Sequence, residues 1–582
     1  MSAQYIPDIN INQVDPAWET ILLSTRDVAQ DIPINFKPTP SISLTRACFS
    51  NGEYTAAKFT CLSNLLAFGY SRFVIDLYWL PDRSEWSLCP TSTLPTVPSP
   101  QGNQIICDDA LRGNLDWLWG FWNDWIEKTE FNTLASVVML VFNLYPDVNT
   151  RTGGSKFPTP IWSASRDFPS RIYTPFDLRV DREDLNVTWL NGGNEGDDEG
   201  RYFSVQPGED GGLSSVDAWP SEGYLSFEKG ERLLLGIGDV RVQGFVFEVG
   251  GNGDGRFFFG KEQIGWPYTE RSKALCYFDA EKTSVSQVNN SWAGMVDGQG
   301  NRWTRETMRE AIECGYSPVV NTTAVSTSIK ASSNSTNSPS SSLNLAKPIM
   351  DYFSLIKGSV WSWAPGQPSP PPSNMTENEI DLFRCAAMNT HTGRWVVADC
   401  NEHYRAACRV EDCPYKWTVG ERAGSYSDTR KLCPKGAVFD VPRSALENRY
   451  LWRAVNESLG TFSTQASRKS RGGEGLVMAR RDGGGVSGLD RVWVDFQSLG
   501  HRACWVRGGD MGAEQGCPYG NEDQGNKSVI VPTVAAVIFL VVAGLMVFVR
   551  VGSWRWERRR KKRWREARRW GKEGWEYEGV PA

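Results

Sequence analysis

Apolar positions in the first half of the chain follow two alternating patterns. Three short, nearly continuous apolar runs occur at 71–79 (SRFVIDLYW), 136–145 (SVVMLVFNLY) and 232–240 (RLLLGIGDV). Between them lie amphipathic stretches such as 55–68, which has helical spacing and is followed by Gly69 as a candidate C-cap. Continuous apolar runs are typical of strands buried on both faces, and such strands alternating with helices form parallel sheets. We therefore expect an α/β, barrel-like domain over residues 1–270.

The pattern changes in the second half. Residues 321–344 (NTTAVSTSIKASSNSTNSPSSSLN) are of low complexity and are interpreted as a flexible insertion. After about residue 346 the chain is rich in Cys, Trp, Gly and Pro and has few long apolar runs. This composition predicts a disulfide-rich, loop-rich α+β region with less helix than the first half.

A long apolar segment near the C-terminus predicts a membrane helix. Ser528 to Val549 carries no charge and is long enough, at about 1.5 Å per residue, to span the hydrocarbon core of a bilayer. A strongly basic run follows it directly. Because Lys and Arg stay on the cytoplasmic side, we expect a transmembrane helix at 528–550, a cytoplasmic tail at 551–582, and all preceding residues in the lumen or outside the cell.

Charge separates the tail from the rest of the protein. The chain has a net charge of −6, and its tail is about +6, so the preceding residues carry about −12. An acidic ectodomain is unlike a nucleic-acid binder, and we predict no direct nucleic-acid partner. The tail, with Trp554, Trp556, Trp564 and Trp570 among basic residues, has the composition of a nucleic-acid arm. We favour a positive-inside anchor with interfacial Trp, which is also compatible with binding to anionic lipid.

Sequons and cysteines agree with this topology. Glycosylation sequons precede the apolar segment at Asn186, Asn289, Asn321, Asn334, Asn374 and Asn456, and a seventh, at Asn526, lies too close to the membrane to be modified. All 13 cysteines also precede it, as in a domain that folds in an oxidising compartment, and their odd number leaves at least one thiol free or paired between chains. The first 25 residues have no signal-peptide pattern, so we expect the natural start to lie upstream.

The most specific local spacing lies at 361–410. Fourteen residues separate Cys385 from Cys400 and seven separate Cys400 from Cys408, and the segment also contains a W-x-W, a GQP and a GRW. This resembles the second half of a C-type lectin-like domain, over residues 271–412 with the Ser-rich insertion inside it. The resemblance implies a Cys385–Cys400 disulfide and a second bond from Cys408 to a cysteine on an upstream helix, for which Cys314 is suitably placed.

The calcium ligands of that lectin-like family are replaced in this chain. The triplet that holds calcium reads Gln367-Pro368-Ser369, and the ligand strand reads Trp395-Val396-Val397. Valine supplies no oxygen to a hard cation, so we do not expect calcium-dependent sugar binding and predict no metal or other cofactor. Residues 413–527 would form a further, membrane-proximal module with four cysteines.

Histidine is scarce where catalysis would need it. The three histidines lie at 391, 403 and 501, so residues 1–390 have none. The segment LLAFGYSRFVIDLYW resembles the barrel of phosphatidylinositol phospholipase C-like enzymes, which use a pair of histidines as acid and base. That chemistry is excluded in this region. Carboxylate-based glycoside hydrolysis is left open, with Asp76, Asp82 and Glu85 as candidates at a strand end, where a structural role is the commoner one.

The chain as a whole resembles the fungal family called maintenance of telomere capping protein 6. The segments that carry the resemblance are RDVAQDIPINFKPTPSISLTRACF, GYSRFVIDLYWLPDRSEWSLCP, RIYTPFDLRVDREDLNVTWL, EGYLSFEKGERLLLGIGDV, GRWVVADCNEHYRAACR and FDVPRSALENRYLW. It implies a single-pass type I membrane glycoprotein with a role in telomere capping, which the acidic ectodomain makes indirect. We expect a non-enzymatic binding or structural protein with a glycan or protein ligand; the alternative is a lumenal carboxylate hydrolase acting on glycans or lipid head groups.

Overall fold

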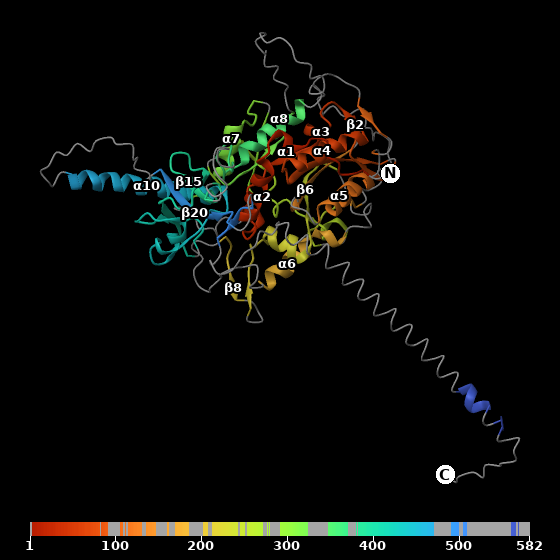
Figure 1. Cartoon of the computed structure of the whole chain (residues 1–582). Helices are drawn as coiled ribbons and strands as arrows, with labels where there is room; N and C mark the ends of the chain where they lie inside the picture. Colours follow the sequence, from red (N-terminus) through yellow and green to blue (C-terminus); the bar gives the residue numbers. More distant parts are fainter. Residues whose placement is uncertain are drawn as a thin grey trace, which may run out of the picture. The chain divides into compact units, whose positions relative to one another are not determined.

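The computed structural model contains two units, Met1–Glu514 and Gln515–Ala582 (Figure 1). It describes residues 3–81, 83–90, 105–108, 111, 115–130, 135–146, 160–161, 169–185, 202–207, 212–242, 245–250, 253–271, 276–277, 279, 292–298, 300–323, 347–369, 380, 382–411, 413–470, 490–499, 504–508, 560–565 and 568–569.

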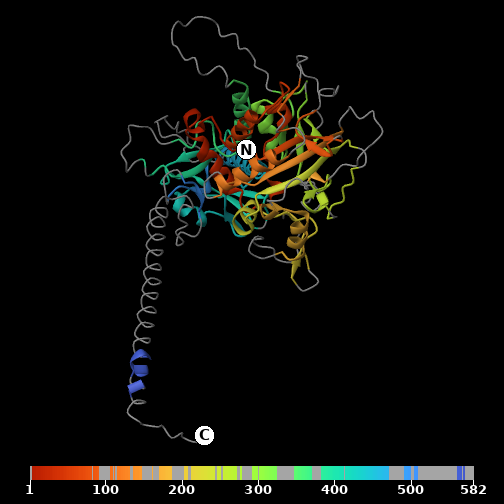
Figure 2. The same cartoon turned by 90° about the vertical axis from the view of Figure 1, so that its right-hand side faces the viewer.

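Parallel strands of the first unit follow one another in chain order around a partial barrel (Figure 2). Their hydrogen-bonded order is β11-β10-β6-β3-β1-β14-β13-β12, so the first and last strands of the barrel pair and the path ends at β11 and β12. The strands are β1 (Ser41–Ser43), β3 (Arg72–Leu80), β6 (Val138–Pro146), β10 (Leu233–Val240), β11 (Phe258–Phe259), β12 (Thr269–Glu270), β13 (Gly294–Val296) and β14 (Ser317–Val320).

The three apolar runs of the sequence are the long central strands β3, β6 and β10. Their outer faces pack against helices: Phe73 on β3, for example, lies 5.7 Å from Trp122 of α5, ring centre to ring centre. Their inner faces form a separate apolar cluster that includes Met139, Val141 and Leu234. Burial on both faces is why these strands read as continuous apolar runs.

Helices and short elements surround this sheet. Antiparallel β4 (Glu85–Ser87) extends β3, and β7 (Ile172–Tyr173) pairs with β10. The other pieces are α1 (Ile11–Val14), α2 (Trp18–Val28), α3 (Leu44–Cys48), α4 (Phe59–Ala67), α5 (Asp116–Thr129), α6 (Pro175–Glu183), the π-helix Tyr224–Lys229, α7 (Arg305–Glu313), α8 (Lys347–Ile356), β2 (Glu53–Tyr54) with β5 (Ile106–Cys107), and β8 (Gln206–Pro207) with β9 (Leu213–Ser214).

Local sequence signals account for the helix ends. The predicted helix at 55–68 is α4, and Gly69 follows it at a φ of +99°, where an added Cβ would lie 2.7 Å from Leu22. Helix α6 begins with a capping box between Thr174 and Asp177, with Pro175 at its first position.

The barrel continues past residue 270, which corrects the predicted domain boundary. Strand β13 pairs with β14, and β14 pairs with β1, so both belong to the barrel sheet. The Ser-rich insertion at 321–344 therefore follows the last barrel strand. These strands have only three or four residues each, too few to give a clear apolar run in the sequence.

A second, mostly antiparallel sheet lies in the C-terminal part of the first unit. Its order is β16-β15-β20-β17-β18, with β19 on β17 and β21 on β20. Fully buried Trp363, Trp395 and Trp493 fill its two faces. The elements are η10 (Lys357–Ser359), β15 (Cys385–Asn389), β16 (Trp395–Ala398), β17 (Arg405–Val410), β18 (Trp417–Val419), η11 (Tyr426–Lys431), β19 (Ala437–Phe439), α10 (Ala445–Ser470), β20 (Arg491–Gln497) and β21 (Val506–Arg507). The lectin-like assignment of this region stays a prediction.

Five disulfides join described cysteines: Cys48–Cys61, Cys89–Cys107, Cys276–Cys314, Cys385–Cys400 and Cys408–Cys433. The Cys385–Cys400 bond is the one implied by the lectin resemblance. The expected Cys314–Cys408 bond is not formed, because Cys314 ends the barrel helix α7 beside Cys276, whereas Cys408 lies on β17 of the second sheet. Cys504 is also disulfide-bonded, to a partner outside the described residues.

Several predicted features fall outside the described residues, namely the apolar segment Ser528–Val549, Asp82, and the sequons at Asn186, Asn289, Asn334, Asn374 and Asn526. Among the helices described, none has both the length and the apolar character to cross a membrane. The sequon residues Asn321 and Asn456 are described, and both are exposed.

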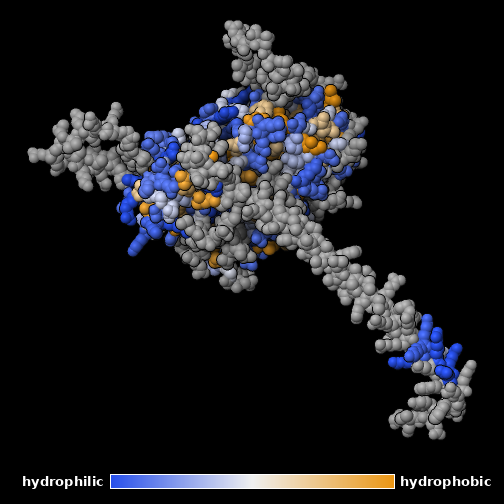
Figure 3. All heavy atoms as spheres, viewed as in Figure 1, coloured by the Kyte–Doolittle hydropathy of each residue, from blue (hydrophilic) through white to orange (hydrophobic). Residues whose placement is uncertain are grey.

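Hydrophilic side chains predominate among the coloured residues of the face in Figure 3, and apolar ones form small separate groups. In the second unit, residues 560–565 and 568–569 are helical, exposed and rich in Lys and Arg.

Replacing Cys276 and Cys314 together by Ser should destabilise the first unit by roughly 2–4 kcal/mol, because the bond closes a loop with a sequence separation of 38 residues. Urea unfolding of the double variant and the parent measures this loss. Non-reducing peptide mapping of the parent checks the pairing, and a peptide joining Cys314 to Cys408 would contradict it.

Candidate functional site

Asp76 lies at the middle of β3, on its inner face, close to the level where β1 and β10 end. Residues 72, 74, 76 and 78 alternate with the helix-facing positions of that strand. The Asp76 carboxylate accepts a hydrogen bond from Asn143 Nδ2 at 3.0 Å, and a second one from the Thr45 side chain, which follows β1. The side chains of three neighbouring strands or their loops therefore meet at this carboxylate.

Asn143 connects Asp76 to β10. It is buried and in register with Asp76, and its Oδ1 accepts the backbone N–H of Asp239 at 2.9 Å. This approach requires glycine at position 238, because a Cβ there would lie 2.4 Å from Asn143 Oδ1. The amide thus holds both strand ends in fixed positions, and its two hydrogen bonds set which way it faces.

Cations and aromatic rings surround the carboxyl group. Arg46 and Arg241 lie close enough to Asp76 to act on its ionisation, and the Arg241 guanidinium lies 5.1 Å from the centre of the Tyr145 ring. Tyr145 also stacks on Tyr78 at 5.6 Å. Asp239 accepts the indole N–H of Trp266 at 2.8 Å. We call Thr45, Arg46, Asp76, Tyr78, Asn143, Tyr145, Asp239, Arg241 and Trp266 the mouth cluster.

Burial controls the protonation of the mouth cluster. It raises the pKa of Asp76, and the hydrogen bonds from Asn143 and Thr45 and the charges of Arg46 and Arg241 only partly oppose it. Burial, together with the charge of Asp76, raises the pKa of Tyr145 to about 12, so this phenol stays a neutral donor and acceptor at physiological pH. The cluster offers donors, acceptors and aromatic faces to a polar ligand.

The other predicted carboxylates are not gathered here. Glu85 is exposed on β4 opposite Leu80, four residues beyond Asp76, or about 13 Å along the strand at ~3.3 Å per residue. That separation is longer than the roughly 5–9.5 Å between paired carboxyl groups of glycosidases. His391 and His403 are exposed in the second sheet's part of the chain.

Sequence reasoning missed most of the mouth cluster. Asn143 and Asp239 interrupt the apolar runs of β6 and β10 in their C-terminal halves, and Asp76 interrupts that of β3 at its middle. Because parallel barrel strands end at the same rim, these three interruptions were the available signal. Arg46 and Trp266 lie in segments that connect barrel strands, and no sequence pattern pointed to them.

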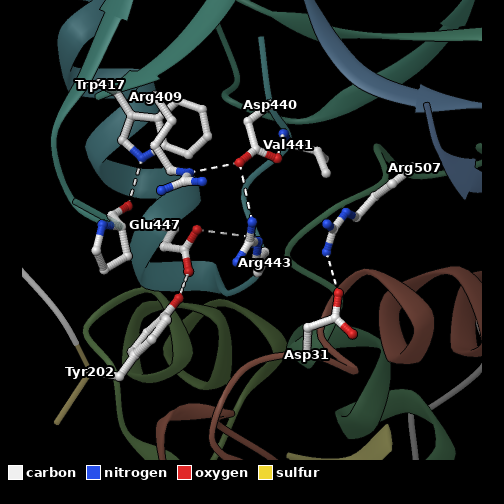
Figure 4. Close-up of polar contacts among 10 residues, drawn as sticks. Asp31, Tyr202, Arg409, Trp417, Asp440, Val441, Arg443, Glu447 and Arg507 are labelled. Carbon is white, nitrogen blue, oxygen red and sulfur yellow. Dashed lines mark hydrogen bonds and ion pairs between the residues drawn. The ribbon is translucent and has the colours of Figure 1, made fainter. Parts of the chain in front are cut away.

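A buried polar network joins the barrel to the second sheet (Figure 4). Asp440 Oδ2 accepts hydrogen bonds from Arg409 Nε at 2.7 Å and Arg443 Nη2 at 3.2 Å, and its Oδ1 accepts Val441 N–H at 2.8 Å. Burial alone would raise the pKa of Asp440, but the nearby arginines hold it below its usual range.

Two contacts of this network reach barrel residues. Glu447 of α10 accepts the phenol O–H of Tyr202 and the backbone N–H of Arg443, and Arg507 pairs with Asp31 at 2.5 Å (Figure 4). The ion pairs of Asp440 with Arg409 and Arg443 are largely buried, so loss of one partner would leave an uncompensated charge. The hydrogen bond between Tyr202 and Glu447 connects this part of the network to the barrel half of the chain.

The fold and the site define a disulfide-bonded partial TIM-barrel protein with a second sheet fixed to the barrel. The family model described as the MTC6 partial TIM-barrel domain matches residues 13–342, more than half of the chain. A maintenance of telomere capping protein 6 from Meyerozyma guilliermondii is 22% identical, over 98% of this chain and 96% of the relative, and one from Saccharomyces cerevisiae is 22% identical, over 92% and 86%. The chain belongs to this family, and the name of these relatives is its link to telomere capping.

Solved structures give only a distant similarity. A calcium-dependent phosphoinositol-specific phospholipase C from Pseudomonas sp. is 13% identical, with a TM-score of 0.26, over 50% of this chain and 84% of that one. A similarity of this size does not bear on activity.

The pH dependence of stability should reflect Asp495, which lies beside Asp440. Burial, and next the charge of Asp440, raise the pKa of Asp495 to about 7. Because this folded-state pKa exceeds the unfolded value of about 3.9, the contribution is full at low pH and is lost as pH rises through 7. Between pH 5 and 8 the free energy of unfolding should fall by roughly 2–3 kcal/mol more in the parent than in Asp495→Asn.

Denaturant unfolding at a series of pH values measures this difference. Asp490→Asn is the matched control, because Asp490 precedes the same strand and its side chain is 69% exposed. Parallel stability profiles for the parent and Asp495→Asn would contradict the assignment.

Proposed function

We propose that this protein is a non-enzymatic binding protein of the secretory pathway or cell surface, which recognises a polyhydroxylated ligand such as a glycan at the mouth cluster. The observation that carries the proposal is the fixed arrangement around Asp76. Two carboxyl, one amide and two guanidinium groups surround aromatic rings on the side of the barrel where barrel proteins bind their ligands.

The chemistry of the cluster suits a ligand with many hydroxyl groups. Asn143 and Asp76 are hydrogen-bonded to each other. The groups that an incoming ligand meets are therefore Arg241, which is 59% exposed, and half-buried Tyr145. A guanidinium donates in a fixed fork, and a tyrosine ring provides a flat apolar face with a polar edge. A glycan ring presents both hydroxyl acceptors and an apolar C–H face to such a pair.

The membrane topology supports this location as part of the proposal. The uncharged segment at 528–549, the basic residues after it, the sequons and the disulfides all suit a single-pass type I membrane glycoprotein with the barrel in the lumen or outside the cell. A barrel on that side has no access to chromosomes, so we propose that the effect on telomere capping is indirect.

One observation favours the alternative, a carboxylate-dependent hydrolase acting on glycans or lipid head groups. Burial raises the pKa of Asp76, and a general acid needs a raised pKa. The second carboxylate of such a site would be Asp239, since Glu85 lies too far along the strand. We favour binding because Asp76 is already held by Asn143 and Thr45.

A glycan array probed with the purified full-length protein, with and without calcium, should identify calcium-independent ligands. Arg241→Gln and Tyr145→Ala should each weaken binding to the best ligand by about tenfold, since each removes one direct contact worth roughly 1–2 kcal/mol. Arg179→Gln, at an arginine of α6 that is 64% exposed, is the matched control. Equal affinity for all four proteins would refute a ligand site at the mouth.

The same ligand distinguishes binding from hydrolysis. Asp76→Asn keeps the shape of the side chain, and neither it nor the parent should release reducing sugar or head group on prolonged incubation. Release by the parent and not by folded Asp76→Asn would establish the hydrolase instead.

Endoglycosidase treatment of the natural protein should increase its electrophoretic mobility. Asn321→Gln and Asn456→Gln should each remove part of that shift, because both side chains are exposed. A protein whose mobility is unchanged by the enzyme would rule out the lumenal topology.

A further inference from the structure

A cavity lies at the opposite end of the barrel from the mouth cluster, where the central strands begin. Its volume is about 180 Å³, and its lining includes Arg72 and Met139 at the starts of β3 and β6. Trp361 and Arg443, from the chain around the second sheet, also line it. The cavity therefore lies between the base of the barrel and the second sheet's region; we call it the base cavity.

Much of the lining is apolar. Leu22, Leu66, Ile356 and Trp361 contribute side chains from α2, α4, α8 and the W-x-W segment. Leu22 and Ile356 approach each other across Gly69, whose Cβ position lies 2.7 Å from the first and 3.7 Å from the second. An apolar cavity of this kind is suited to a hydrocarbon group.

Arg72 gives the base cavity a positive charge. Its side chain is 5% exposed, and its guanidinium stacks over Trp292 at 4.6 Å. It donates to Ser317 Oγ at 2.9 Å and more weakly to the Lys37 carbonyl at 3.5 Å. A guanidinium has five N–H donors, so these two acceptors leave capacity for an oxyanion.

The other cations that line the cavity each have a carboxylate partner. Lys37 pairs with Glu222, Arg26 with Asp27 at 2.8 Å, and Arg443 with Asp440 at 3.2 Å. Within the part of the chain that the structure describes, no carboxylate lies within ion-pair distance of Arg72.

The charge of Arg72 is thus buried without a countercharge. Burial lowers its pKa to about 10, so it stays protonated at neutral pH. Its neighbour Tyr268 has a pKa raised to about 12 and is neutral there. A buried charge is costly unless it is paired, and an anion in the adjoining cavity would supply the partner.

We propose that the base cavity binds a small amphiphilic anion, with its oxyanion head on Arg72 and its hydrocarbon tail against Leu22, Leu66, Ile356 and Trp361. A cavity of about 150 Å³ holds a six-carbon ring, so a tail of roughly six to eight carbons fits. Carboxylate and phosphate heads share the required chemistry. The site is separate from the mouth cluster and does not depend on the function proposed for it.

Thermal unfolding of the purified full-length protein, in one neutral detergent throughout, tests the proposal with octanoate, octyl phosphate, 1-octanol and octylamine. At least one of the two anions should raise Tm by roughly 2–4 °C at saturation, and the neutral and cationic analogues should not. The stronger of the two anions identifies the head group.

Arg72→Met should abolish the anion-dependent rise, and Arg72→Lys should keep part of it. Arg179→Gln, at an arginine of α6 that is 64% exposed and lies outside both sites, should leave it unchanged. If Arg72→Met does not fold, the comparison of the anions with 1-octanol on the parent decides alone. No rise with either anion, an equal rise with 1-octanol, or a full rise in folded Arg72→Met overturns the proposal.

Discussion

The two-sided burial of β3, β6 and β10 is the constraint on which the rest of the structure depends. Their outer faces must be apolar to hold the helices, and in β3 every second residue from Phe73 to Trp79 serves that purpose. The inner face of β3 does not carry this demand at every position, since buried Val74 lies between Arg72, which begins the strand, and Asp76 at its middle. The polar groups of this face therefore lie on either side of Val74, with Arg72 toward the base of the barrel and Asp76 toward the mouth cluster.

The chain around the second sheet covers the base of the barrel. The segment FDVPRSALENRYLW supplies Asp440, Arg443 and Glu447, and these residues form the buried network that reaches Tyr202 and Arg507 with Asp31. Arg443 belongs both to this network and to the lining of the base cavity. A segment far from the barrel in sequence thus contributes Arg443 and Ser444 to the lining at the base of the barrel.

The sequence predicted the parts of the fold that have a strong local signal. Apolar runs located β3, β6 and β10, and helical spacing with Gly69 located α4. Strands β13 and β14 escaped because they are short and rely on pairing with β1 for their place. The predicted Cys314–Cys408 disulfide was wrong for the same reason, namely that the pairing depends on tertiary contacts. Cys276 is close to Cys314 only because α7 returns to the barrel. In the mouth cluster, the sequence pointed to Asp76 as a candidate site residue. It could not point to Asn143 and Arg241, because their closeness to Asp76 depends on which strands are neighbours in the barrel.

The two charged residues on the inner face of β3, Arg72 and Asp76, cannot compensate each other. Arg72 and Asp76 are four residues apart on one strand, or about 13 Å, and at an effective dielectric constant of about 20 their attraction is about 1.3 kcal/mol. Burying either charge costs several kcal/mol. Each of the two charges must therefore be stabilised by groups in its own surroundings. Asp76 does so with two hydrogen bonds, two nearby arginines and a raised pKa. Arginine cannot release its proton near neutral pH, so the base retains a positive charge for which the described residues supply no carboxylate partner.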